Sequence, residues 1–200
     1  TIGTKEYIKK YPDEVKRMFG GINMDMVGED LIKCQTYFML SLSPYSLPTF
    51  INDLSQEFAE LCMELNNDGL AIYPGNKYGK LSYKVISPTG NRYPFYVRVM
   101  GYDGGSDHLV FTNGSVGVPM VYYECWPDLF YHSNMDLPDK SDPTQLKRVA
   151  FIAAATAITA CGANDDDLIN IAMECFCRSK TRIDSDFKKS LFLLSKSIPN

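Results

Sequence analysis

Apolar runs of two kinds alternate along this 200-residue chain, and this alternation constrains its fold more than any other feature. Residues 22–27, 34–42 and 117–125 are short apolar runs, as is typical of strands buried in an α/β sheet. Residues 46–65 repeat apolar side chains every three or four positions, which predicts a helix. The sequence therefore predicts an α/β fold with a mostly parallel sheet, helices on both faces, and ligands at the carboxyl ends of strands.

Helix starts and stops are marked in several places. Asp142 followed by Pro143 predicts a helix start, and the Ala-rich run after it should continue to Cys161, with Gly162 as its stop. Residues 4–18 predict two short helical pieces that Pro12 separates.

The remaining segments give two further predictions. Residues 80–86 and 92–100 flank a Ser-Pro-Thr-Gly-Asn turn, which predicts a hairpin. The tail after residue 164 predicts two helices, one starting near Asp165 and the other near Asp184.

Composition excludes several classes of function. With 45% hydrophobic and 22% charged residues, the chain is expected to fold as one globular domain. A net charge of −4 and the absence of a Lys/Arg stripe argue against nucleic-acid binding. No apolar run of about 18 residues is present, so no transmembrane segment is expected. The sequence does not indicate a compartment.

Three short motifs carry residue types that serve metal and catalytic sites. Asp25 ends the first predicted strand in Asn-Met-Asp-Met-Val-Gly, and both histidines of the chain lie in polar motifs further on. Carboxylates and imidazoles are the ligands that zinc takes most readily alongside thiolates. The candidate site residues are Asp25, Ser106, Asp107, His108, Tyr131, His132 and Asp136.

Taken together and in this order, the motifs resemble those of the two-zinc aminopeptidases, leucine-aminopeptidase-like enzymes of the superfamily of zinc exopeptidases and glutaminyl cyclases. The resemblance implies peptide substrates and two zinc ions, with Asp25 and His132 as ligands of different ions. It also implies that Ser106, Asp107 and His108 lie beside the metals and hydrogen-bond to the ligands or to the substrate amine. Asp136 would orient the loop that carries His132.

Plainer interpretations exist for the same residues. An aspartate at a strand end is often a turn residue, and a lone histidine is often only a hydrogen-bonded polar residue. Asp107 could instead cap a short helix that runs through Phe111.

The chain also departs from the family pattern. The stretch between Asp25 and Ser106 is longer than in the compact members of that family, so the resemblance implies that residues 71–102 are a hairpin insertion. The His-x-Asp and Glu-Glu pairs that supply the other zinc ligands and the general base in these aminopeptidases are absent from this sequence. Residues 1–200 are therefore expected to be the C-terminal portion of a single zinc-peptidase catalytic domain. By itself this portion should be inactive and essentially metal-free, and it could form a homodimer through its unpaired sheet edge.

Three functions fit these observations to different degrees. The first is a zinc-dependent aminopeptidase, as the activity of a longer parent protein. The second is a non-catalytic, peptidase-like binding module. The third is a glutaminyl cyclase, which is disfavoured because Ser106 stands where the cyclases carry an acid and Tyr131 stands where they carry tryptophan.

Overall fold

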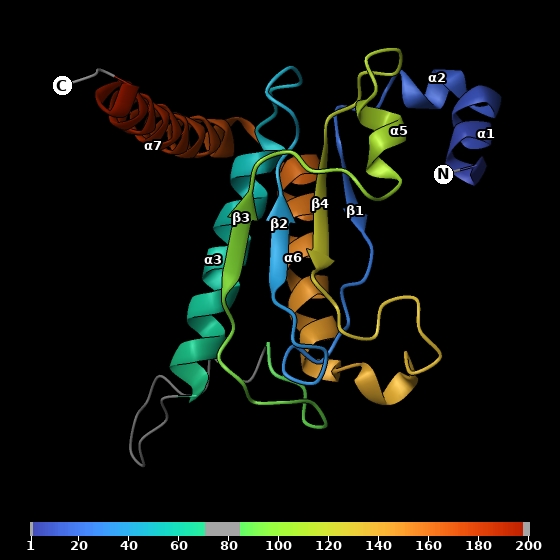
Figure 1. The fold of residues 1–200 in the computed structure, drawn as a ribbon. Coiled ribbons are helices and arrows are strands. Elements are labelled where there is room, and N and C mark those ends of the chain that lie inside the picture. Colours follow the sequence, from blue (N-terminus) through green and yellow to red (C-terminus); the bar gives the residue numbers. More distant parts are fainter. Residues whose placement is uncertain (1, 71–84, 198–200) are drawn as a thin grey trace. The chain divides into compact units, whose positions relative to one another are not determined.

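The computed structural model describes residues 2–70 and 85–197 (Figure 1). The chain divides into two compact units, Thr1–Cys161 and Gly162–Asn200. The first unit holds the sheet and the candidate site, and the second holds a long helix.

A four-stranded sheet forms the centre of the first unit, in the order β1-β4-β2-β3. Its strands are β1 (Gly21–Met24), β2 (Phe38–Ser41), β3 (Val97–Met100) and β4 (Met120–Cys125). The pairs β1–β4 and β2–β3 are parallel, whereas β2 and β4 are antiparallel. The predicted mostly parallel α/β sheet is thus confirmed, although the strands are shorter than the apolar runs that indicated them.

Strand β4 shows how the two faces of the sheet are covered. Tyr123 is fully buried on one face, and its hydroxyl donates to Ser55 Oγ of α3 (Ile51–Leu70) at 2.9 Å. The same hydroxyl lies 3.5 Å from Thr156 Oγ1 of α6 (Pro143–Gly162), so α3 and α6 both cover this face. On the opposite face, Tyr122 stacks against His108 of α5 (His108–Thr112). Helices therefore lie on both faces, as predicted (Figure 1).

The helix boundaries at Pro12 and Pro143 are also confirmed. Helices α1 (Ile2–Lys10) and α2 (Pro12–Val15) are separate, because proline cannot donate the backbone hydrogen bond of a helix interior. At the start of α6, the Asp142 carboxylate accepts the backbone N–H groups of Thr144 and Gln145 at 3.0 and 3.2 Å. A short 3-10 helix, η1 (Pro138–Lys140), precedes this cap.

Two predictions about secondary structure are corrected. The tail forms one helix, α7 (Asp165–Ser197), rather than two, because no proline or glycine interrupts these residues. The second strand of the predicted hairpin shortens to β3, which pairs in parallel with β2 of the main sheet. Residues 71–84, which include most of the first hairpin strand, lie outside the described residues. The interpretation of residues 71–102 as an insertion stays a prediction.

A buried arginine of α6 joins this helix to α3 and to the segment before β3. Arg148 is 1% exposed, and its guanidinium donates to Asn66 Oδ1 at 2.8 and 3.0 Å. It also donates to the carbonyl of Tyr93 at 2.8 Å and to Gln145 Oε1 at 3.3 Å, and it lies over the Phe95 ring. Burial lowers the pKa of this guanidinium. The network fixes the segment before β3 to both α3 and α6.

Strands β1 and β3 form the two edges of the described sheet. The expected homodimer through such an edge stays a prediction. Among the helices of the described residues, none has the length and apolarity needed to cross a bilayer.

Candidate functional site

A pocket of about 460 Å³ lies beside the carboxyl ends of β1 and β4. Three stretches that are distant in the sequence line it: the turn after β1, the loop after β3, and β4 together with the loop that follows it. The lining residues are Asp25, Met26, Glu29, Asp103, Gly104, Gly105, Tyr122, Glu124, Trp126, Tyr131, His132 and Asp136. The two predicted metal ligands, Asp25 and His132, therefore share one pocket with Tyr131 and Asp136.

Asp25 is held by the loop that carries the Gly-Ser-Asp-His motif. Its backbone N–H donates to the carbonyl of Tyr123 at 3.1 Å, which continues the pairing of β1 with β4 for one residue. The buried Ser106 hydroxyl donates to Asp25 Oδ2 at 2.7 Å and accepts from Asn23 Nδ2 at 2.9 Å. This chain of hydrogen bonds orients the exposed carboxylate of Asp25, the kind of role predicted for Ser106.

His132 occupies an unusual backbone conformation in the loop after β4. Its φ is 54°, and Met26, which also lines the pocket, has a φ of 58°. A non-glycine residue in this left-handed region costs on the order of 1–3 kcal/mol, and such strain is concentrated at functional sites. The imidazole stacks on Tyr131 with 3.7 Å between ring centroids, and Tyr131 meets the edge of Trp126. Aromatic packing thus holds the strained loop.

The last two residues of the Gly-Ser-Asp-His motif, Asp107 and His108, do not line the pocket. His108 is 1% exposed, donates from Nε2 to the carbonyl of Asp103 at 2.7 Å, and stacks on Tyr122 with 4.4 Å between centroids. Asp107 precedes α5 at the cap position, but its side chain makes no cap hydrogen bond there. His108 can act on the pocket only through Asp103 and Tyr122, and direct contact of Asp107 or His108 with metal or substrate stays a prediction.

Three acids of the pocket were not predicted from the sequence: Glu29, Asp103 and Glu124. Burial raises the pKa of both Glu29 and Glu124. Glu124 is only 7% exposed and accepts a hydrogen bond from Tyr122, while its Oε1 has no hydrogen-bond partner among the described residues. Burial also raises the pKa of Tyr122, so this hydroxyl keeps its proton and remains a donor.

The described residues do not make up a complete zinc site. A catalytic zinc takes three protein ligands, and a pair of zincs needs a bridging carboxylate as well. In residues 2–70 and 85–197, no group of three His, Cys, Asp or Glu side chains is placed to hold a metal ion. Asp25 and His132 have donor atoms that suit a metal ion, and a zinc site that included them would need further ligands.

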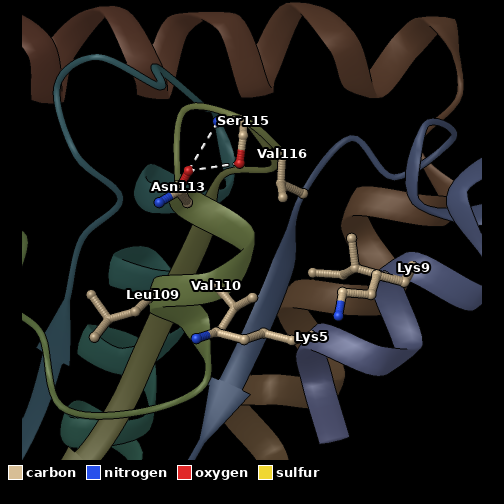
Figure 2. Close-up of a pocket in the computed structure, with 8 residues that line it drawn as sticks. Lys5, Lys9, Leu109, Val110, Asn113, Ser115 and Val116 are labelled. Carbon is tan, nitrogen blue, oxygen red and sulfur yellow. Dashed lines mark hydrogen bonds between the residues drawn. The ribbon is translucent and has the colours of Figure 1, made fainter. Parts of the chain in front are cut away.

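A second pocket, of about 520 Å³, lies between α1 and α5. Figure 2 shows Leu109 and Val110 of α5 across from Lys5 and Lys9 of α1. The Asn113 side chain at its rim accepts two hydrogen bonds from Ser115. Among the described residues that line it, none is an acid, a histidine or a cysteine.

Comparison with known proteins identifies the family of this chain. Residues 1–157 match Peptidase family M28, and the chain therefore belongs to this family. Helix α7 lies outside the matched region. No curated protein matches the chain.

A solved structure, an aminopeptidase from Aneurinibacillus sp. strain AM-1, is similar to this chain with a TM-score of 0.53 and 21% identity. The match covers 80% of this chain and 30% of that protein. At this identity the similarity shows a shared fold, and the chain spans less than a third of the length of the protein it matches.

Proposed function

We propose that this chain supplies part of the active site of a zinc-dependent aminopeptidase that removes N-terminal residues from peptides. The observation that carries the proposal is the placement of Asp25 and His132. These two residues come from distant parts of the chain and line one pocket. The chain belongs to Peptidase family M28. The similar fold of a solved aminopeptidase supports the choice of an exopeptidase.

In this proposal the residues of the chain have distinct roles. Asp25 and His132 donate to zinc, and Ser106 fixes the orientation of the Asp25 carboxylate. Zinc, when bound, supplies Lewis-acid polarisation of a peptide carbonyl. The remaining ligands and the general base would come from a part of the protein outside this sequence, because the sequence contains neither the His-x-Asp pair nor the Glu-Glu pair.

The first test uses the chain as it stands. Purified residues 1–200 should contain well under one equivalent of zinc by elemental analysis, and they should not hydrolyse aminoacyl anilides. A catalytic zinc needs more donors than Asp25 and His132 provide. Two equivalents of tightly bound zinc, or robust hydrolysis, would show that this division of the site is wrong.

The second test uses a longer protein that contains this chain. It should hydrolyse aminoacyl anilides in a zinc-dependent manner, and Asp25→Asn or His132→Ala should abolish this activity. Asp13→Asn is the matched control, because Asp13 lies in α2, where it binds Lys16. Activity that survives the pocket substitutions would refute the assignment, and peptide binding without hydrolysis would identify a peptidase-like binding module.

A further inference from the structure

The candidate site carries far more negative charge than the proposed ligands explain. Five carboxylates line the pocket together with one imidazole, and no lysine or arginine of the described residues lines it. Besides Asp25, these acids are Glu29, Asp103, Glu124 and Asp136. Like charges that gather in one cavity repel each other unless a cation joins them. Burial raises the pKa of Glu124, and the negative charges of Asp103 and Asp25 raise it further.

Glu124 shows most clearly that a partner is missing. It lies on β4 beside Tyr122, is more than nine-tenths buried, and has one carboxylate oxygen without a hydrogen-bond partner among the described residues. A buried carboxylate oxygen without a partner is unfavourable, because the group has lost its hydration and gained no hydrogen bond in return. Asp25 accepts a hydrogen bond from Ser106 and His132 stacks on Tyr131, and neither of these contacts involves Glu124. The glutamate is therefore available to a ligand.

The form of the pocket indicates which kind of cation fits. The acids of the pocket come from three separate stretches of the chain: the turn after β1, the loop after β3, and β4 with the loop that follows it. An extended cation with several N–H donors can reach separated acceptors, as a guanidinium does. Trp126 and Tyr131 add aromatic surface to the same cavity, which suits an aliphatic stem and a cationic head.

We infer that Glu124, with Asp103, binds the cationic side chain of an N-terminal arginine or lysine, so that the protein selects peptides that begin with a basic residue. Glu124 would act as a specificity-determining residue beside Asp25 and His132. The inference rests on the proposed function, because it names the residue that such an aminopeptidase would remove.

The test is a binding titration that needs no hydrolysis. Trp126 is the only tryptophan of the sequence and lines the pocket, so its fluorescence reports on ligands there. The chain is titrated with arginine amide, lysine amide and norleucine amide, which share a free amine and differ in the charge of the side chain. Arginine amide and lysine amide should each bind about tenfold more tightly than norleucine amide.

Substitutions assign this preference to its residue. Glu124→Gln keeps the shape of the side chain and removes its charge, and it should reduce the preference for arginine amide to about threefold or less. Asp103→Asn, in an exposed loop, should weaken the preference without a risk to folding. Glu64→Gln, on the exposed surface of α3, is the matched control and should change nothing.

The outcomes separate this inference from the proposed function. Equal binding of the three amides, or no binding of arginine amide into the millimolar range, would overturn the inference. A preference that Glu124→Gln leaves intact would also overturn it. In the longer protein, hydrolysis with no preference for basic residues would leave the aminopeptidase assignment standing and refute the role of Glu124. Charge-dependent binding without any hydrolysis would support the role of Glu124 and refute the aminopeptidase assignment.

Discussion

Replacing Ser106 with alanine tests the hydrogen-bond chain that positions Asp25. The substitution removes the 2.7 Å bond to Asp25 Oδ2 and the acceptor of Asn23 Nδ2. A buried hydrogen bond to a charged group contributes about 1.5–3 kcal/mol, whereas exposed charged pairs contribute about 0–1 kcal/mol. Ser106 is buried and Asp25 is exposed, so we expect a coupling of about 1 kcal/mol between them. With the loss at Asn23, Ser106→Ala should cost about 1–2 kcal/mol in total.

A double-mutant cycle isolates the coupling from the other effects. Ser106→Ala, Asp25→Ala and the double variant are unfolded in urea, with Trp126 fluorescence as the signal for the unit that contains the sheet. The control cycle pairs Asp25→Ala with Ser115→Ala, because the Ser115 hydroxyl bonds only within its own turn, to Asn113. The control cycle should be additive.

The reasoning fails if the first cycle is also additive. Distant, independent sites add within about 0.3–0.5 kcal/mol, so a coupling in that range would mean that Ser106 does not hold Asp25. The role of Ser106 in the proposed aminopeptidase site would then have no support.

Three further predictions concern stability. Gly90→Ala should cost about 1–3 kcal/mol in a urea melt, because a Cβ there would lie 2.3 Å from the backbone nitrogen of Thr144; a neutral result would refute the clash. Asn66→Leu should lower the free energy of unfolding by about 3–5 kcal/mol, because it leaves the buried Arg148 cation poorly paired. Arg148→Met should lower it by only about 1–3 kcal/mol, because it leaves a neutral acceptor unpaired, and the opposite order would refute this account. Burial raises the pKa of Glu124 in the folded state, so its contribution to stability is present below the unfolded pKa and lost as pH rises through the folded value. Glu124→Gln should therefore become more stable than the natural chain as pH rises from about 4 to 8, and parallel melting curves would contradict it.

The sequence predicts the fold well where local chemistry decides it. Asp142 and Pro143 define the start of α6 because a carboxylate caps free N–H groups and proline fits the first turn. Near Asp184 the same kind of signal is misleading, since an acidic residue within a continuous helical pattern does not end a helix. The antiparallel pairing of β2 with β4 depends on contacts between distant segments, which no local pattern reveals.

Only part of the candidate site could be predicted from the sequence. Asp25 and His132 stand in recognisable motifs, and the structure brings them to one pocket. Glu124 was hidden within a run that predicts a buried strand. The alternation of β4 offers the missing signal, because Tyr122 and Glu124 share one face while Val121, Tyr123 and Cys125 are fully buried on the other. A glutamate on a buried strand of this kind is expected to have a specific function.

The loop and helix after β3 contact both the proposed metal ligand Asp25 and Tyr122, which lies next to Glu124 on β4. Gly105 has a φ of 120°, a conformation that favours glycine, and it allows the chain to turn into the site just before Ser106. Ser106 then holds Asp25, while His108 packs on Tyr122, which in turn donates to Glu124. One short motif thus supports both the proposed metal ligand and the proposed specificity residue. Because His108 is fixed by burial and by its bond to the Asp103 carbonyl, the motif can act as a rigid support while remaining outside the cavity.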